Sequence, residues 1–373
     1  MSFLDIERET LERLLPGLDA ALAAMPLMEM ERVGNPAIDV FRRLGGPGLL
    51  VPRAFGGSGA APLEALRAQR AIAARSPSLA VATNMHHLTI ASLIGIDPDD
   101  PGLEGALLEQ VAKEKLYIAS GFAEGRPGGS IQTSALQIVP CDGGYRVNGR
   151  KRPCSLSRSM DLLAISLPPP EGMDAGLAAA IIPADTPGVS WRPFWNSPIL
   201  TGAESEEILL QDVVVPAKAL FPLGGSGRSN AVQDRGFLWF ELLIAGAYVG
   251  IASRLVEMVL EQGRAGAADR VSLATEIEGA MAALEGIARA MEAGGRRNRD
   301  LGRMMLVRYA VQGAIERATD LAVELLGGIP FMSSADVTYL LAASRGLGLH
   351  PPARAAASER LAAHLAGAEF VVD

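Results

Sequence analysis

The fold class is decided by one stretch near the middle of the chain, Leu136-Gln137-Ile138-Val139-Pro140-Cys141-Asp142-Gly143-Gly144-Tyr145-Arg146-Val147. Its two ends carry β-branched and aromatic residues, which favour strands. Between them lies Asp142-Gly143-Gly144, and Asp-Gly and Gly-Gly pairs are typical of the tight turn that joins two antiparallel strands. The stretch therefore predicts a β-hairpin.

Short β-rich runs, separated by Gly, Pro and Asp turns, continue on both sides of this hairpin. Examples are Leu162-Leu163-Ala164-Ile165-Ser166, Ala180-Ile181-Ile182 and Asp212-Val213-Val214-Val215-Pro216. Several short strands with regular turn signals indicate a β unit rather than isolated strands. We predict a small antiparallel β domain over residues 116–222.

The segment that precedes this β domain, residues 1–115, predicts helices. Four leucines fall on one face at helical spacing: Leu11, Leu14, Leu15 and Leu18. Asn35 followed by Pro36 is a favourable N-cap and first-turn pair for a further helix. The run of glycine and proline at 45–48 ends that helix, because neither residue propagates it. We predict an N-terminal helical domain.

Residues 223–373 predict a C-terminal four-helix bundle. The Gly-Gly-Ser-Gly run at 224–227 lacks the lysine of a phosphate loop and favours a linker. Long helical patterns follow at 237–261, 273–293, 304–326 and 354–366. The second of these has apolar residues at three- and four-residue intervals, which gives one apolar stripe. The fold class predicted for the whole chain is α+β, mainly α.

Composition excludes several classes of partner. Of 373 residues, 49% are hydrophobic and 20% charged, as in an ordinary globular protein, and the net charge of −8 gives no electrostatic reason to bind nucleic acid. The apolar run at 242–249 is too short to cross a bilayer, and the acidic N-terminus does not resemble a signal peptide. With only Cys141 and Cys154, neither a metal cluster nor a structural disulfide is expected. We expect a cytoplasmic protein without membrane or nucleic-acid partners.

Five motifs, in this order, resemble those of the acyl-CoA dehydrogenase superfamily. They are Leu44-Gly45-Gly46-Pro47-Gly48-Leu49-Leu50-Val51-Pro52, Gly121-Phe122-Ala123-Glu124-Gly125-Arg126-Pro127-Gly128-Gly129-Ser130, Tyr145-Arg146-Val147-Asn148-Gly149-Arg150-Lys151, Thr201-Gly202-Ala203-Glu204-Ser205 and Leu326-Gly327-Gly328. The third is the closest match, to "Y-x-(I/L)-NG-x-K". The resemblance spans nearly the whole chain. It implies helices, a β domain and a helical bundle, in agreement with the pattern of elements above.

The resemblance also implies a flavin between the β domain and the bundle, and a homodimer or homotetramer. We expect FAD as the cofactor. The family's arginine motif for the adenosine pyrophosphate is missing, which makes FMN the alternative. Arg264 lies in the corresponding region, where it could contact a phosphate or be a surface charge. Family positions imply a set of cofactor-binding residues: Ala123, Glu124, Gly129, Ser130, Ser155, Arg264, Gly327 and Gly328.

Ser155 matches the family position where a hydroxyl faces flavin N5 or O4; a turn serine is the alternative. The family's catalytic glutamate is replaced at both of its known positions, by Pro351 and by Phe240. His350, which precedes Pro351, and Glu241, which follows Phe240, are the substitutes that the sequence offers. Histidine suits proton transfer because its pKa lies near neutrality, although a lone histidine is often structural. The predicted catalytic residues are His350, Ser155 and Glu241.

A second histidine pair lies where the family's chain approaches the substrate. His86 and His87 are adjacent on a predicted helix, so their side chains point about 100 degrees apart and do not suit one metal ion. We predict that either could contact the substrate, together with Phe240. No metal site is expected, and the HExxH, GxSxG and strand-linked GxGxxG motifs are absent.

Three functions compete. The first is α,β-dehydrogenation of an acyl thioester, possibly an acyl-CoA, with an atypical base. The second is a reduced-flavin-dependent monooxygenase acting on a small apolar substrate, since His350 and Ser155 also resemble residues of the monooxygenases with this fold. The third is a flavin-binding homologue without catalytic activity.

Overall fold

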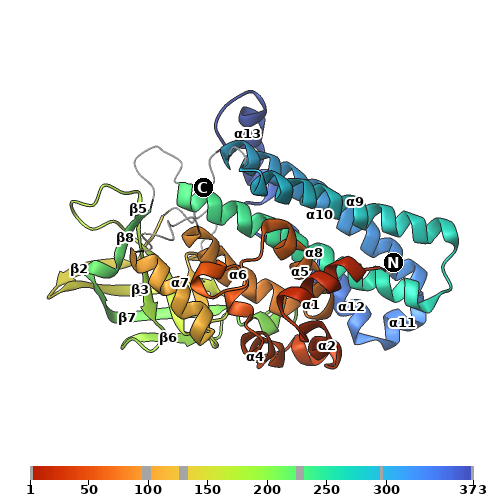
Figure 1. Cartoon of the computed structure of the whole chain (residues 1–373), viewed down its shortest axis with the longest axis horizontal. Coiled ribbons are helices and arrows are strands. Elements are labelled where there is room, and N and C mark those ends of the chain that lie inside the picture. Colours follow the sequence, from red (N-terminus) through yellow and green to blue (C-terminus); the bar gives the residue numbers. More distant parts are fainter. Residues whose placement is uncertain (1–2, 95–101, 126–132, 224–230, 295–296, 371–373) are drawn as a thin grey trace.

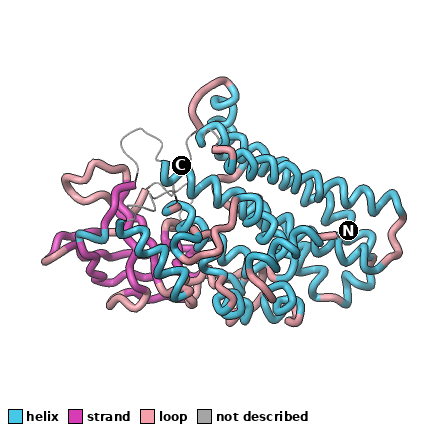
Figure 2. The backbone as a smooth tube through the Cα atoms, viewed as in Figure 1, coloured by secondary structure: helices cyan, strands magenta, loops and turns pink. Residues whose placement is uncertain are grey.

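The longest helix, α8 (Ala231–Gln262), crosses the computed structural model from the strands at one end to the opposite end of a helical body (Figure 1). The structure describes residues 3–94, 102–125, 133–223, 231–294 and 297–370. Helices α5, α6, α9, α10 and α12 pack around α8. Strands occupy a separate region at one end, as Figure 2 shows. The predicted mainly helical α+β fold is confirmed.

Seven helices and two short 3-10 turns precede the strands in the described residues. They are α1 (Asp5–Leu14), α2 (Leu18–Ala23), α3 (Leu27–Met30), α4 (Pro36–Arg43), η1 (Gly46–Gly48), η2 (Arg53–Phe55), α5 (Pro62–Arg75), α6 (Pro77–Leu93) and α7 (Gly102–Glu114). The Asn35 side chain accepts a hydrogen bond from the Ala37 N–H at 2.9 Å, so the predicted N-cap of α4 is confirmed.

The middle of the chain forms two four-stranded sheets. Their elements are β1 (Ile118–Gly121), β2 (Gln137–Cys141), β3 (Gly144–Cys154), β4 (Leu162–Leu167), β5 (Leu177–Pro183), β6 (Val189–Arg192), η3 (Thr201–Ala203), β7 (Glu206–Pro216), η4 (Ala217–Ala219) and β8 (Leu220–Leu223). The strand orders are β1-β4-β5-β8 and β2-β3-β7-β6. Strands β2 and β3 form the predicted hairpin, in which Gly143 has a φ of +77°.

One strand pair differs from the antiparallel prediction. Strand β1 pairs with β4 in parallel, whereas the other neighbouring strands are antiparallel. A parallel pair requires a long crossover connection, and here residues 122–161, which include the β2–β3 hairpin, connect β1 to β4. The sequence of β1 alone carries no signal of that direction.

The C-terminal part contains the four long helical segments that the sequence predicts, and two helices that it does not. The elements after α8 are α9 (Ala267–Glu292), α10 (Arg297–Leu326), α11 (Gly328–Ser333), α12 (Ala335–Ser344), η5 (Arg345–Leu349) and α13 (Arg354–Leu365). Helix α12 packs against both α8 and α10. It therefore contributes to the bundle at a place where the sequence prediction had no helix.

Helix α8 also has the length and apolar character of a membrane span, within Gln233–Gln262. Of its most apolar window, 89% is buried inside the protein. Helices in the described residues cover it from several directions, so burial in the protein core accounts for the apolar sequence. The predicted linker at 224–227 lies outside the described residues.

Candidate active site

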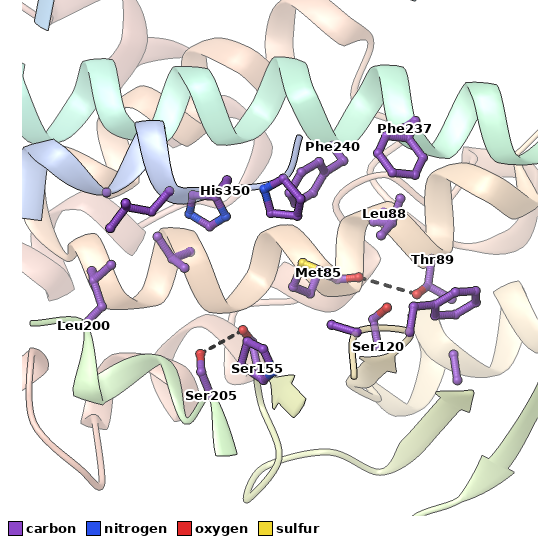
Figure 3. Close-up of a pocket in the computed structure, with 18 of the residues that line it drawn as sticks. Met85, Leu88, Thr89, Ser120, Ser155, Leu200, Ser205, Phe237, Phe240 and His350 are labelled. Atoms are coloured by element: carbon purple, nitrogen blue, oxygen red, sulfur yellow. Dashed lines mark hydrogen bonds between the residues drawn. The ribbon is translucent and has the colours of Figure 1, made fainter. Parts of the chain in front are cut away.

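A cavity of about 540 Å³ lies between the helices and the strands (Figure 3). Helix α6, the part of α8 from Gln233 to Tyr248, and the turn η5 with His350 line one side, and the sheet β1-β4-β5-β8 lines another. Its lining is mostly apolar. The volume is in the range of sites that hold cofactors or small ligands.

The sheet β1-β4-β5-β8 forms one wall of this cavity. Ser120 on β1 is directly paired with Ala164 on β4, which in turn is paired with Ile181 on β5. All three side chains line the cavity. The small side chains of Ser120 and Ala164 leave room for a flat ring against the sheet. The buried Ser120 Oγ has no hydrogen-bond partner among the described residues, and a buried hydroxyl without a partner is costly unless a ligand completes it.

Ser155 stands at the end of β3, opposite the start of β7. Because Cys154 pairs with Glu206 across these strands, Ser155 lies next to Ser205, and their hydroxyl oxygens are 3.0 Å apart. Both serines are buried and line the cavity. The pair can donate to or accept from a ring atom, which fits the position that the family resemblance implies for Ser155.

His350 lies across the cavity from these serines (Figure 3), and its ring contacts two aromatic rings of α8. Its ring centroid is 6.2 Å from that of Phe240 and 5.5 Å from that of Tyr248. The Tyr248 hydroxyl is 2.9 Å from His350 Nε2. Burial, together with the nearby Arg308 charge, lowers the pKa of His350 to about 4. His350 is therefore neutral near pH 7.

The fully buried Arg308 of α10 holds the backbone that carries His350. It donates to the carbonyl oxygens of Leu347 at 2.9 Å and His350 at 2.6 Å. It also donates to Glu241 Oε2 at 2.8 Å. Burial raises the pKa of Glu241 to about 7, although the Arg308 charge opposes the shift. Glu241 does not line the cavity and is fully buried. The structure thus places Glu241 behind His350 and outside the cavity lining.

The structure brings together only some of the predicted cofactor-binding residues. Ala123 lines the cavity with Ser155. Glu124 instead accepts a 2.8 Å bond from the buried Lys151 ammonium, an interaction within the β domain. Gly129 and Ser130 lie outside the described residues.

The remaining predicted cofactor-binding residues lie far from the cavity within one chain. Arg264 is exposed in the turn between α8 and α9, and Gly327 and Gly328 lie where α10 meets α11. Both places are at the end of the helical body farthest from the strands (Figure 1). None of the three contacts the cavity of its own chain.

The structure brings neither His86 nor His87 to the cavity, although Phe240 lines it. His86 Nε2 is 2.8 Å from the Pro47 carbonyl oxygen, and its Nδ1 accepts from the Ile118 N–H at 3.0 Å. His87 packs against the Phe41 ring with centroids 6.2 Å apart. Burial lowers the pKa of both histidines, to about 4 for His86. They are core residues here, and the other face of α6 lines the cavity with Met85, Leu88 and Thr89.

Sequence reasoning missed Tyr248, Ser205 and Arg308. Ser205 lies in one of the recognised motifs, but a motif does not say which hydroxyl reaches a site. Tyr248 is in an apolar run, where an aromatic residue indicates core packing. Arg308 follows four apolar residues on α10. A single charged residue after such a run is the one sequence signal that its side chain is buried and needs a partner.

The lowered pKa of His350 predicts a pH dependence of stability. Between about pH 6.5 and 4 the unfolded chain binds a proton at this histidine and the folded chain does not, so stability falls as pH decreases through that window. His350→Gln removes this contribution. Urea unfolding at a series of pH values should show a shallower fall in the variant than in the wild type. A fall of equal steepness would contradict the buried, neutral histidine.

Comparison with known proteins identifies the family. No protein-family model matches the chain. Isobutylamine N-hydroxylase of Streptomyces viridifaciens is 44% identical over 375 residues, which cover 98% of this chain and 99% of that protein.

Solved structures share the fold over nearly the whole chain. KijD3, in complex with FMN and dTDP-3-amino-2,3,6-trideoxy-4-keto-3-methyl-D-glucose, has a TM-score of 0.81 at 21% identity, over 97% of this chain and 94% of that one. PigA in an FAD complex has a TM-score of 0.78 at 18% identity, over 97% of both chains. The predicted superfamily is confirmed: the protein belongs to the same family as isobutylamine N-hydroxylase, within the acyl-CoA dehydrogenase superfamily of flavin-dependent enzymes.

Proposed function

We propose that this flavin-dependent oxidoreductase hydroxylates the nitrogen of a small aliphatic amine, using a reduced flavin and molecular oxygen. A relative of 44% identity is named for the N-hydroxylation of isobutylamine. Solved relatives hold FMN or FAD, which supports FAD or FMN as the cofactor of this chain. When bound, the reduced flavin supplies two electrons to oxygen, so that one oxygen atom goes to the amine and the other to water.

One observation carries this choice over dehydrogenation: among the described residues, no carboxylate reaches the part of the cavity around His350. Glu241 is held by Arg308 and does not line the cavity. The carboxylate that does line it, Asp234, is at the N-terminal end of α8, about 21 Å along the helix axis from Tyr248. Removal of an α-proton needs a base in contact with the substrate.

The same environment suits an amine as the substrate. An amine attacks as the neutral base, and burial in apolar surroundings disfavours its charged form. Aromatic side chains, among them Phe122, Phe237 and Phe240, line the cavity together with aliphatic ones. They would bury an alkyl chain and exclude water. None of the described residues places a carboxylate in that part of the cavity to pair with an ammonium ion.

The residues that line the cavity indicate which side chains would contact the flavin. Ser155 and Ser205 offer hydroxyls to the polar edge of the ring, and Ser120 offers a hydroxyl that has no partner in the described part of the chain. Ala123 and Ala164 let the ring approach the backbone. His350 lies on the opposite wall, where a neutral imidazole can donate or accept a proton.

A direct test supplies the enzyme with a flavin, a flavin reductase and oxygen, and offers isobutylamine and other small aliphatic amines. We expect an amine-dependent hydroxylamine, identified by mass spectrometry, that disappears when oxygen or the reductase is omitted. The competing dehydrogenation of an acyl thioester predicts bleaching of oxidised flavin by an acyl-CoA under nitrogen. Such bleaching without any hydroxylamine would overturn the proposal.

His350→Ala should depress turnover by roughly tenfold or more, the low end of the effect of losing an acid–base group, and should leave flavin affinity unchanged. Steady-state rates and flavin titration measure the two effects separately. His364→Ala is the control, because His364 lies on α13 outside the cavity. Equal loss in both variants, or none in His350→Ala, would remove this histidine from the mechanism.

We also propose that the protein is a homodimer or homotetramer. Arg264, Gly327 and Gly328 belong to the predicted cofactor site, but lie far from their own chain's cavity. At the same end, α11 exposes Ile329 and Met332 to 75% and 79%, and exposed apolar groups of this kind favour contact with another chain.

Light scattering at micromolar concentration should give a dimer or tetramer, and Met332→Glu should lower the average mass. A monomeric wild type would contradict the assembly.

A further inference from the structure

The Tyr248 hydroxyl is buried in the core of the helical body, beside the imidazole of His350. Tyr248 is fully buried on α8, and burial raises the pKa of its phenol, so the phenol keeps its hydrogen. Among the described residues, its hydroxyl has one hydrogen-bond partner, His350 Nε2 at 2.9 Å. Tyr248 borders the cavity but is fully buried, and the described residues offer its hydroxyl hydrogen no second acceptor.

This limits which ring nitrogen of His350 carries the proton. A neutral imidazole has one N–H and one bare nitrogen, and the hydrogen bond at one nitrogen sets the state of the other. If Nε2 carried the hydrogen and donated to the phenol oxygen, the phenol hydrogen would be buried without an acceptor, which is costly. If Tyr248 donates to Nε2, both groups are satisfied. Nδ1 must then carry the hydrogen.

Nδ1 is the ring nitrogen left for the cavity. His350 lines the cavity. Within the described part of the chain, its Nδ1 has no protein hydrogen-bond partner. This atom is not fully buried either. An N–H at this atom therefore meets whatever occupies the cavity. An N–H donates, whereas a bare nitrogen would accept, so the tautomer decides which ligand atoms His350 can contact.

We propose that Tyr248 is a positioning residue that fixes His350 as its Nδ1–H tautomer, so that the cavity is presented with a hydrogen-bond donor. The tautomer is a property of the protein without cofactor or substrate. Its consequence for catalysis rests on the proposed function: Nδ1–H can donate a hydrogen bond to an oxygen acceptor in the cavity.

The surrounding backbone is shaped for this contact. A Cβ on Gly346 would come within 2.3 Å of the Tyr248 hydroxyl oxygen, so only glycine at this place in η5 lets the phenol reach His350. Arg308 holds the turn from the other side through the carbonyl oxygens of Leu347 and His350. Turn and phenol together fix the distance between the hydroxyl and Nε2.

The tautomer can be measured directly, because the chain has four histidines. Long-range proton–nitrogen NMR on apoprotein labelled with ¹⁵N-histidine distinguishes a protonated ring nitrogen from a bare one, and His350→Gln assigns the signal. His86 is an internal reference with the opposite tautomer. Its Nδ1 accepts from the Ile118 N–H, so its Nε2 carries the hydrogen and donates to the Pro47 carbonyl oxygen. At neutral pH we expect Nδ1–H for His350 and Nε2–H for His86.

Tyr248→Phe should change the two nitrogen shifts of His350 toward a mixture of tautomers and leave those of His86 in place. Tyr309→Phe is the matched control, because the Tyr309 hydroxyl donates to the Pro352 carbonyl at 3.0 Å in the same segment without touching the imidazole. It should leave the His350 tautomer unchanged.

Wild-type His350 with Nε2–H, or unchanged His350 shifts in Tyr248→Phe, would overturn the proposal. The wild-type spectrum decides even if the variant does not fold. No flavin or amine is in the sample, so failure here is distinct from failure to form a hydroxylamine.

Discussion

The position of His350 depends on one buried guanidinium. Arg308 donates to backbone carbonyl oxygens on both sides of a turn and pairs with Glu241. The chain after His350 continues with Pro351 and Pro352, which have no N–H to donate. This segment therefore cannot anchor itself through its own amides, and side chains from α10 do so instead: Arg308 before the prolines, and Tyr309 at the Pro352 carbonyl.

The opposite wall of the cavity is tied to the helices by a second buried contact. The Tyr339 hydroxyl of α12 donates to Glu31 and accepts from the Leu200 N–H at 2.9 Å. Leu200 lines the cavity. Burial raises the pKa of Glu31, while hydrogen bonds from Ser78 and Tyr339 oppose the shift. One carboxylate thus links the N-terminal helices, α12 and the β domain. The side of the cavity with Ser155 and Ser205 faces the side with His350 because both are anchored to the same helical body.

Patterns of neighbouring residues predicted much of this fold, and the resemblance to the acyl-CoA dehydrogenase superfamily predicted the location of the site. The Asn35 cap and the turn at Gly143 depend on neighbouring residues, so the sequence alone indicates them. The parallel pairing of β1 with β4 depends on residues far apart in the chain, and no local pattern encodes it. Helix α12, which was not predicted, shows the same limit, because its packing on α8 and α10 stabilises it.

The site shows which inferences needed three dimensions. His350 and Ser155 came from family positions, and both line one cavity. His86 lies one residue from the cavity-lining Met85, but adjacent helical residues point in different directions, and the sequence could not say which one faces inward. The sequence offered Glu241 as a base, but in the structure it forms a buried ion pair with Arg308 of α10. The two residues are 67 positions apart, so no local pattern in the sequence indicates the pair.

The central claim is that a flavin ring lies in the cavity between Ser155 and His350. A crystal structure of the protein with its flavin tests this most directly. We expect the isoalloxazine against the wall formed by Ser120 and Ala164, with its polar edge toward Ser155 and Ser205 and His350 across from it. A ring bound elsewhere, with this cavity closed by the protein's own side chains, would contradict the account.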